Sequence, residues 1–145
     1  MIIAIIGCPG VGKTTTCNAL KMQGFKVRSI DDFFEKGKSK YNPQNSKQAY
    51  TKLFKSLEKG DYLLDVCGNA PEFLAHKEQV CDKIIKLHAP YKTIVARYKQ
   101  RQKEEDISLQ EFKESEEVES DVVIDTSRLD VQQVAKIVLE HLKQE

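Results

Sequence analysis

The sequence lacks a marked excess of charge of either sign, a long apolar run and any closely spaced pair of cysteines. With 23 Lys and Arg against 22 Asp and Glu, the net charge of +1 gives no bulk attraction to nucleic acid or to an anionic membrane. The longest apolar run, Met1 to Ile6, is too short to cross a bilayer and lacks the features of a signal peptide. We therefore expect a cytoplasmic protein that recognises its ligands at a local site.

The cysteines and the chain length narrow the class of protein further. Cys8, Cys17, Cys67 and Cys81 lie far apart, with no histidine at zinc-ligand spacing. This spacing argues against a zinc knot and against a secreted disulfide framework, and it fits a reducing compartment. A length of 145 residues is that of one domain with a single core, so we expect one domain over residues 1–145.

Short segments rich in isoleucine and valine alternate with helical segments, which is the pattern of a parallel sheet covered by helices on both faces. The predicted strands are residues 1–6, 25–30, 61–67, 83–88 and 121–125. The predicted helices are residues 13–22, 46–57, 71–80, 90–105, 109–118 and 131–143. The polar, turn-rich segment 35–44 is long for a connector, and we interpret it as a mobile substrate loop. The sequence thus predicts a three-layer α/β fold with a five-stranded parallel sheet.

A complete match to the phosphate-binding pattern G-x-x-x-x-G-K-[ST] begins at Gly7 and ends at Thr14. An apolar strand precedes the motif and a helix follows it, so backbone N–H groups and the positive end of the helix would face phosphate oxygens. Lys13 would neutralise the β and γ phosphates, and the Thr14 hydroxyl would bind Mg²⁺. The residues expected to surround the nucleotide phosphates are Gly7, Pro9, Gly10, Val11, Gly12, Lys13, Thr14 and Thr15. The motif predicts a site for a nucleoside triphosphate, ATP by preference, together with Mg²⁺.

Three aspartates follow predicted strands, at the sheet edge where ligands of open parallel sheets bind. Asp31 and Asp32 come after the second strand, and Asp65 ends the third. Either of the first two is able to orient an acceptor hydroxyl or to hold Mg²⁺ through water, and the alternative is a helix cap or turn residue. Asp65 suits the carboxylate that holds the waters of Mg²⁺, with a strand-end turn as the alternative. Asn69 is a further candidate for substrate contact.

Residues 65–68, Asp-Val-Cys-Gly, also fit the D-x-x-G pattern of a GTPase switch. A GTPase of this type carries an N-K-x-D segment after a later strand to read guanine, and this sequence has no such segment. The pattern therefore does not indicate a GTPase.

The sequence resembles the nucleoside monophosphate kinase-type P-loop kinases, a group that includes adenylate kinases and dephospho-CoA kinases. The resemblance covers nearly the whole chain, from the opening residues 1–15 to the strand and helix that begin at residue 121. It implies that an R-x-x-x-R pair, here Arg97 and Arg101, begins a short lid, with the first arginine against the adenine and the second reaching the phosphates. It also implies that residues 126–129 pass beside the adenine through backbone atoms. The alternative for the arginine pair is an exposed basic helix face.

The stretch Asp31-Asp32-Phe-Phe resembles uridine kinase-like proteins, in which an aspartate takes the proton of the acceptor hydroxyl. Asp32 is accordingly the candidate catalytic carboxylate. Kinases of the resembled group usually clamp an acceptor phosphate with arginines from the second helix and from the loop after the third strand. This chain has arginine only at positions 28, 97, 101 and 128, outside both segments. Either the lysines at 36, 38 and 40 hold an acceptor phosphate, or the acceptor carries none there.

The sequence predicts an ATP-dependent kinase that transfers the γ-phosphoryl group of Mg-ATP to a small-molecule acceptor, either a nucleotide or a nucleoside-like compound. The predicted catalytic residues are Lys13, Asp32, Arg97 and Arg101. The alternative is a nucleotide-dependent regulatory ATPase that acts as a switch on a protein partner. The two differ in whether ATP turnover requires an acceptor.

Overall fold

The structure is a computed structural model that describes residues 1–8, 10–39, 42–100 and 108–142. The strands are β1 (Ile2–Ile6), β2 (Lys26–Ser29), β3 (Tyr62–Asp65), β4 (Lys83–His88) and β5 (Val122–Asp125). The helices are α1 (Lys13–Lys21), the short 3-10 helix η1 (Ile30–Phe33), α2 (Pro43–Lys55), α3 (Pro71–Val80), α4 (Tyr91–Gln100), α5 (Leu109–Glu116) and α6 (Val131–Leu142). Within these ranges, none of the helices combines the length and the apolar character that a bilayer-spanning segment needs.

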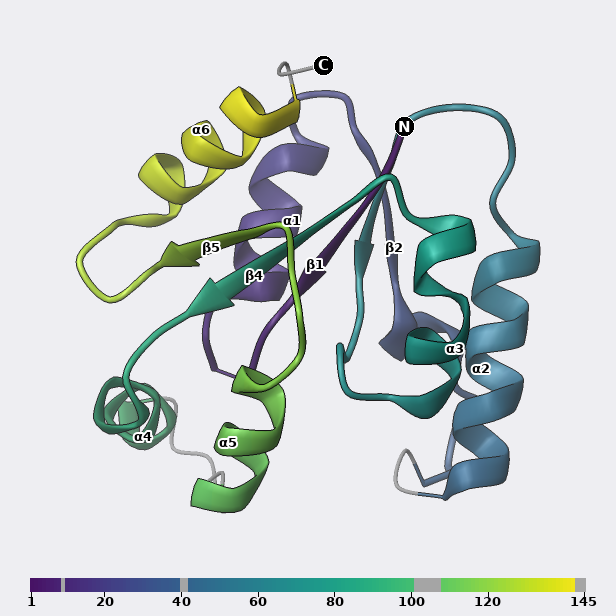
Figure 1. Ribbon diagram of the computed structural model, residues 1–145, viewed down its shortest axis with the longest axis horizontal. Helices are drawn as coiled ribbons and strands as arrows, with labels where there is room; N and C mark the ends of the chain where they lie inside the picture. The colour runs from purple at the N-terminus through teal and green to yellow at the C-terminus, as the bar shows by residue number, and fades with distance from the viewer. Residues whose placement is uncertain (9, 40–41, 101–107, 143–145) are drawn as a thin grey trace.

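The five strands form one parallel sheet in the order β2-β3-β1-β4-β5. Strand β1 lies at the centre, where Ala4 pairs with Leu64 of β3 on one side and with Ile84 of β4 on the other. The chain order therefore reverses around β1, and the carboxyl ends of all five strands meet at one edge of the sheet (Figure 1). Open parallel sheets bind their ligands at such a reversal point.

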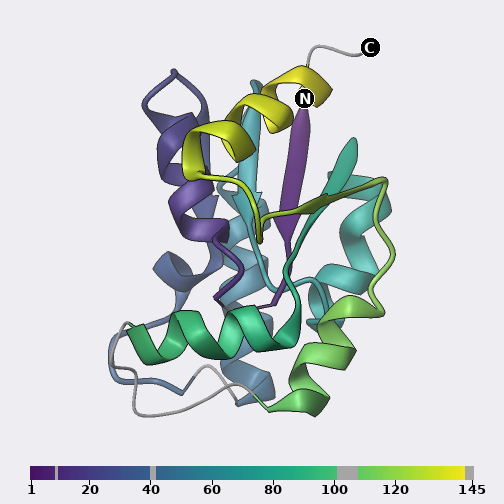
Figure 2. The same ribbon diagram turned by 90° about the vertical axis from the view of Figure 1, so that its left-hand side faces the viewer.

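Helices cover both faces of the sheet, with α1 and α6 on one side and α2 and α3 on the other (Figures 1 and 2). Side chains of a strand alternate between faces, and β1 supplies both layers of the core. Ile3 and Ile5 pack with the layer of α1 and α6, whereas Ala4 and Ile6 pack with the layer of α2 and α3. All four side chains are fully buried, which explains why the strand is an uninterrupted apolar run rather than an alternating one.

The predicted three-layer fold is confirmed, and the differences lie at the ends of elements. Strand β2 ends at Ser29, and the chain turns at once into η1. Helix α2 begins at Pro43 instead of residue 46, because the Asn42 side chain caps it by accepting hydrogen bonds from the backbone N–H groups of Gln44 and Asn45. The predicted loop 35–44 is therefore shorter at its carboxyl end. The last part of the predicted helix 90–105 lies outside the described residues.

Candidate functional site

The phosphate loop joins β1 to α1 at the centre of the ligand-binding edge of the sheet. Gly7 has φ +147°, and a Cβ atom placed on it would lie only 2.6 Å from the carbonyl oxygen of Leu87 in β4. Only glycine therefore fits where the loop leaves the sheet. Gly12, with φ +104°, is the N-cap of α1 and makes no side-chain capping bond, so the first N–H groups of the helix are left for an anionic ligand.

The Lys13 side chain points across the sheet edge from the phosphate loop to the end of β3. Its ammonium group donates a hydrogen bond of 3.1 Å to the Val66 carbonyl oxygen and lies 4.0 Å from Oδ1 of Asp65. Only 15% of the Lys13 side chain is exposed, so the charge is held in one place by the surrounding protein. The ammonium group thus lies between the glycine-rich loop and the carboxyl end of β3.

The two residues predicted to bind the metal, Thr14 and Asp65, lie in direct contact. The Thr14 hydroxyl donates to Oδ2 of Asp65 at 3.0 Å, and the Ser29 hydroxyl lies 3.5 Å from the same oxygen. Hydroxyl and carboxylate oxygens are hard ligands that suit Mg²⁺, which usually takes one or two protein oxygens beside phosphate oxygens and water. Among the residues that the structure describes, no cluster of three or more acidic, histidine or cysteine side chains could hold a metal ion by itself. This donor set fits a magnesium ion that arrives with the phosphates of a nucleotide.

Arg97 of α4 connects the phosphate loop to the end of β5. Its guanidinium group donates to the carbonyl oxygens of Gly10 and Val11 at 3.3 and 3.2 Å, and to the carbonyl oxygen of Thr126 at 3.0 Å. The neighbouring cation Lys99 is exposed, so Arg97 differs from a basic residue on a solvated helix face. Arg101, its predicted partner, lies outside the described residues, as does Pro9 of the phosphate loop.

Thr126 has a larger part in this contact than the sequence predicts. Its side chain is almost fully buried, with 4% of the residue exposed, and its hydroxyl donates to the Val11 carbonyl oxygen at 3.0 Å while lying 3.3 Å from Arg97. The family resemblance implies only backbone contacts from this loop, toward the adenine. A threonine at the end of a parallel strand, where a hydroxyl is able to bond the adjoining loop, is the signal that would have identified it.

The residues that the sequence predicts to contact an acceptor follow β2 and β3. Asp31 and Asp32 both lie within η1 and are exposed. The N-cap of η1 is Ser29, so neither aspartate caps this helix, and both occupy a turn, the other alternative that the sequence leaves open. Asn69 is half-buried in the loop after β3, where its side-chain oxygen accepts from the Cys67 thiol. Asp31, Asp32 and Asn69 thus follow the ends of the two neighbouring strands β2 and β3.

Tyr50, which no sequence motif indicates, positions the loop after β3 from the buried face of α2. Its hydroxyl accepts a hydrogen bond from the Cys67 backbone N–H at 3.1 Å and lies 3.3 Å from the Cys67 carbonyl oxygen. Burial of the ring, which leaves only 2% of the residue exposed, is the largest cause of the raised pKa of its hydroxyl. The hydroxyl therefore stays neutral and acts as a fixed clamp on the loop.

Helix α5 is held against β4 by Glu116 and by Phe112, whose ring lies 6.5 Å from the ring of His88. The side chain of Glu116 lies 2.8 Å from Nδ1 of His88, and its backbone carbonyl accepts a hydrogen bond of 2.8 Å from the buried Lys86 ammonium group.

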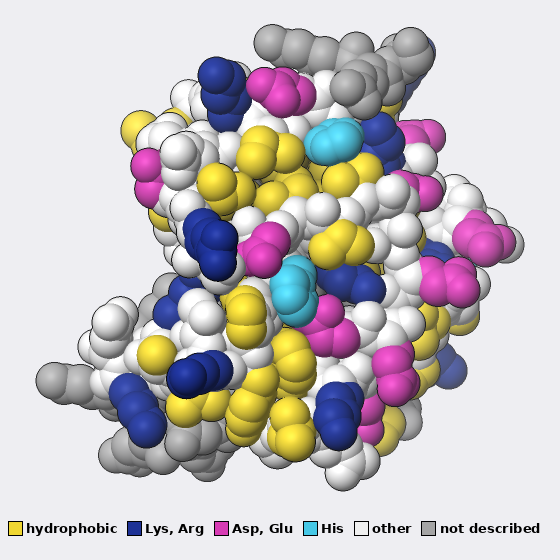
Figure 3. Space-filling model, turned by 60° about the vertical axis from the view of Figure 1, so that its left-hand side comes forward, with side chains coloured by type: hydrophobic (Ala, Val, Ile, Leu, Met, Phe, Trp, Pro, Cys, Tyr) yellow, Lys and Arg dark blue, Asp and Glu magenta, His cyan; other side chains and the backbone are white. Residues whose placement is uncertain are grey.

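The face of the molecule in Figure 3 carries basic and acidic side chains interspersed with apolar ones. No part of that face is a large patch of one sign of charge, in keeping with the net charge of +1.

Burial also determines the protonation state of the Cys8 thiol in the phosphate loop. The Cys8 side chain is fully buried, and burial is the main cause that raises the pKa of its thiol to about 12. The nearby negative charge of Glu116 acts in the same direction, whereas Lys13 lowers the value. The Cys8 thiol therefore remains protonated at neutral pH, and it packs as a small apolar group between β1 and α1.

Comparison with solved structures shows which known fold this chain shares. The structure is similar to the shikimate kinase of Aquifex aeolicus vf5, with a TM-score of 0.71 and 17% sequence identity over 99% of this chain and 96% of that one. It is similar to the tunicamycin resistance protein of Deinococcus radiodurans, with a TM-score of 0.75 and 20% identity over 99% and 96%. It is also similar to a gluconokinase of Sinorhizobium meliloti 1021, with a TM-score of 0.72 and 12% identity over 97% and 90%. The fold is that of the small-molecule P-loop kinases.

The sequence itself matches a family. The family described as the AAA domain matches residues 3–120, and the chain belongs to that family. A search of the curated proteins found no match. The resemblance to P-loop kinases of the nucleoside monophosphate kinase type is thereby confirmed at the level of the fold and the phosphate loop.

Proposed function

We propose that residues 1–145 form one P-loop kinase domain that transfers the γ-phosphoryl group of Mg-ATP to a nucleotide or nucleoside-like acceptor. The observation that carries the proposal is the position of the Lys13 ammonium group, held 3.1 Å from the Val66 carbonyl oxygen and 4.0 Å from Asp65. This position supports phosphoryl transfer because it sets a fixed positive charge between the phosphate loop and the end of β3. The fold shared with P-loop kinases supports the same class of reaction.

Catalysis in this arrangement comes from positioning and from neutralisation of charge. The phosphate loop and the start of α1 would bind the phosphates, and Lys13 would neutralise the charge that develops on the transferring group. Thr14 and Asp65 are the residues that would hold Mg²⁺, which when bound lowers the barrier by neutralising phosphate oxygens. Arg97 bonds Gly10 and Thr126, and it would lie beside the nucleotide on the side of α4. Arg101 is its proposed partner in the lid.

The acceptor would approach from the side of η1 and the loop after β3. In the transfer step the acceptor oxygen forms a bond to the γ-phosphorus as the bond from that phosphorus to the ADP oxygen breaks. The acceptor hydroxyl loses a proton in the same step, and we propose the Asp32 carboxylate as the group that accepts it. Asp31 and Asn69 would contact the acceptor.

A coupled assay of ADP release tests this proposal. The full chain is given Mg-ATP and, in turn, nucleotides, nucleosides and dephospho-CoA, and we expect at least one of them to stimulate turnover. The Lys13→Ala variant serves as the control for contaminating kinases and should show no stimulation. If ATP binds but no acceptor stimulates turnover, the kinase proposal is wrong. Turnover that needs no acceptor and rises with a partner protein would favour a regulatory ATPase instead.

A further inference from the structure

The backbone of the phosphate loop is least constrained by its own residues around Val11. Gly10 and Gly12, on either side of it, have φ +88° and +104°, in the region that favours glycine. Inside the loop, the Val11 N–H donates to the Cys8 carbonyl oxygen at 3.2 Å. Glycine has more backbone freedom than any other residue, so the peptide groups beside Val11 need partners from outside the loop to keep one orientation.

The Val11 carbonyl oxygen has two such partners, one from β5 and one from α4. The Thr126 hydroxyl donates to it at 3.0 Å, and Nη1 of Arg97 donates to it at 3.2 Å. A carbonyl oxygen has two lone pairs and accepts both bonds. Val11 is only 1% exposed, so these bonds form in a low-dielectric interior, where a hydrogen bond is stronger than in water.

Thr126 is itself held firmly by the sheet. Its backbone N–H donates to the His88 carbonyl oxygen at 2.7 Å, just after the last paired residues of β4 and β5. Its side chain is β-branched and almost fully buried, which restricts its rotamers. Its carbonyl oxygen and its hydroxyl lie 3.0 and 3.3 Å from the guanidinium nitrogens of Arg97. Thr126 therefore links the sheet both to the phosphate loop and to α4.

The bonds to the Val11 carbonyl also set the direction of the next N–H group in the loop. The peptide bond between Val11 and Gly12 is trans, and a trans peptide is planar, so the Gly12 N–H points opposite to the Val11 carbonyl. Because that carbonyl faces Thr126 and Arg97, the Gly12 N–H faces away from them. Backbone N–H groups are the ligands that a loop of this kind offers to phosphate oxygens. A donor that is oriented before the ligand arrives binds it at a lower entropic cost.

We infer that Thr126 is a positioning residue of the donor site, and that its hydroxyl holds the phosphate loop in the conformation that binds the nucleotide phosphates. This inference rests on the proposed function and adds to it a residue that acts through Val11 rather than by touching the nucleotide. It differs from a backbone contact of residues 126–129 with the adenine, because the effect of the hydroxyl falls on the phosphates and is independent of the base.

Variants of Thr126 in the full chain test the inference through the Kd for Mg-ATP, measured by calorimetry. Thr126→Val keeps the shape of the side chain and removes the hydroxyl, and we expect the Kd to rise by about fivefold to tenfold. Thr126→Ser keeps the hydroxyl and should stay within about twofold of the unchanged protein. If the valine variant does not fold, Thr126→Ala removes the same hydroxyl and should raise the Kd by a similar factor. An unchanged Kd without the hydroxyl would overturn the inference.

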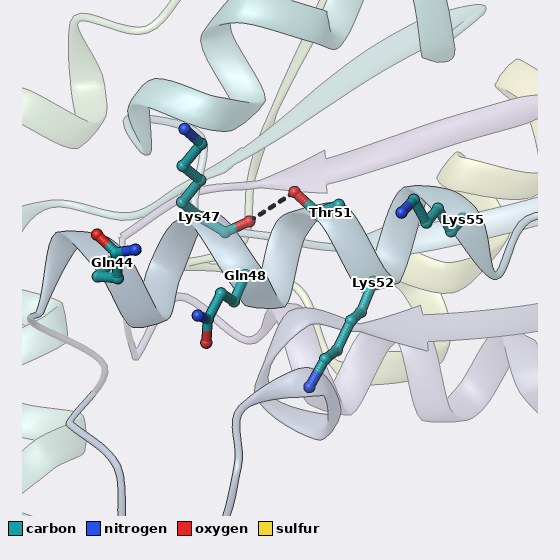
Figure 4. Close-up of a pocket in the computed structure, with 6 residues that line it drawn as sticks. All are labelled: Gln44, Lys47, Gln48, Thr51, Lys52 and Lys55. Carbon is teal, nitrogen blue, oxygen red and sulfur yellow. Dashed lines mark hydrogen bonds between the residues drawn. The ribbon is translucent and has the colours of Figure 1, made fainter.

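Thr51 offers a matched control on the exposed face of α2. Its hydroxyl also donates to a backbone carbonyl oxygen, that of Lys47, at 2.8 Å, and Figure 4 shows this bond. The bond lies beside an open hollow lined by Gln44, Lys47, Gln48, Thr51, Lys52 and Lys55. Thr51→Val makes the same chemical change in a different element, so the Kd for Mg-ATP should stay within about twofold. Equal increases in Thr51→Val and Thr126→Val would overturn the inference.

Inorganic tripolyphosphate distinguishes an effect on the phosphates from an effect on the base. It is titrated in competition with Mg-ATP against the unchanged protein and Thr126→Val. We expect the variant to lose affinity for tripolyphosphate by the same factor as for ATP, within about twofold. A variant that binds ATP more weakly and tripolyphosphate as well as before would place Thr126 beside the base, and the inference would be wrong.

Thermal unfolding and steady-state kinetics separate positioning from a general loss of structure. All affinities are measured well below the Tm of each variant, where a merely structural role would lower the Tm and leave the Kd for ATP unchanged. With any acceptor that stimulates turnover, the KM for ATP should rise in Thr126→Val and the KM for the acceptor should stay within about twofold. Absence of turnover with every acceptor would count against the kinase proposal alone, because ATP binding is measured without turnover.

Discussion

The donor side and the acceptor side of the site are built differently, although both lie at the same edge of the sheet. On the donor side, the groups that would surround ATP are tied to one another: Arg97 bonds the phosphate loop and Thr126, and Thr126 bonds Val11. On the acceptor side, Asp31 and Asp32 are exposed on a single 3-10 turn. Hydrogen bonds between separate elements hold the donor side in place, whereas the acceptor side carries exposed polar residues on a short turn.

This difference follows from what each side must recognise. Every triphosphate presents the same phosphates, so a loop of glycines, one lysine and one hydroxyl residue serves any member of the class. Acceptors differ in shape and charge, so their contacts are placed on short turns and loops that vary without disturbing the sheet. Substitutions on the donor side should therefore impair ATP binding and, where they touch the packed loop, stability. Substitutions on the acceptor side should leave ATP binding largely intact.

The largest loss of activity is expected from Lys13→Ala, which removes the charge between the two sides. We expect acceptor-dependent turnover to fall by about 10²–10³-fold, because a fixed charge at the transferring phosphoryl group is among the strongest contributions to such catalysis. Lys21→Ala, at the exposed end of the same helix, is the matched control and should change turnover less than about twofold. Steady-state ADP release measures both, and equal losses in the two variants would remove Lys13 from the mechanism.

The next largest effect is expected on stability, from Gly7→Ala in the phosphate loop. The added Cβ atom would meet the Leu87 carbonyl oxygen at 2.6 Å, and the backbone at φ +147° is itself strained for alanine. We expect a loss of about 3 kcal/mol or more in the free energy of unfolding, measured by urea titration. Gly12→Ala is the matched variant: its φ is +104°, but nothing lies within 4 Å of the added atom, so the backbone strain alone should cost about 1–2 kcal/mol. Equal losses would mean that the close approach to β4 is unimportant.

A smaller effect on both binding and stability is expected from Arg97→Ala. The variant loses the hydrogen bonds from the guanidinium group to Gly10, Val11 and Thr126, which should lower the free energy of unfolding by about 1–2 kcal/mol. We also expect the affinity for ATP to fall by about tenfold, since the loop loses its tie to the end of β5. Calorimetric titration and thermal unfolding measure the two effects. Lys99→Ala, an exposed cation on the same helix, should change neither, and a common result for the two variants would make Arg97 part of a solvated helix face after all.

The sequence predicts the donor side far better than the acceptor side, and the reason is physical. The phosphate loop is a local motif whose glycines, lysine and threonine are consecutive, and the apolar run before it identifies a buried strand. Thr14 and Asp65 are 51 positions apart, yet their contact could be inferred because the ends of parallel strands share one edge. The hydroxyl contact of Tyr50 could not, since it depends on the rotation of α2, which no local pattern encodes.

The roles of the acceptor residues are harder to predict because they depend on which charged side chains from separate segments come into contact. The sequence shows lysines at 36 and 38 near the predicted acceptor, but the pairing of Lys38 with Glu35 appears only when the turn is built. Likewise, the segment 35–44 looks like a long loop until Asn42 is seen to cap α2. The sequence alone does not distinguish a charged side chain that pairs with a neighbouring residue from one that binds a ligand.

The smallest effect is expected from Asn42→Ala at the start of α2, a variant that tests the acceptor side. Loss of the cap leaves the N–H groups of Gln44 and Asn45 without their side-chain partner, which should cost about 1 kcal/mol of stability and lower the Tm by a few degrees. Tyr50 of α2 bonds the loop after β3 and not the phosphate loop. We therefore expect the KM for the acceptor to rise, while the Kd for ATP stays within about twofold. Asn42→Asp retains a capping oxygen and should restore both quantities. An ATP affinity that falls in parallel with the acceptor KM would show that the two sides are coupled through α2, and the separation of donor and acceptor sides would then have to be abandoned.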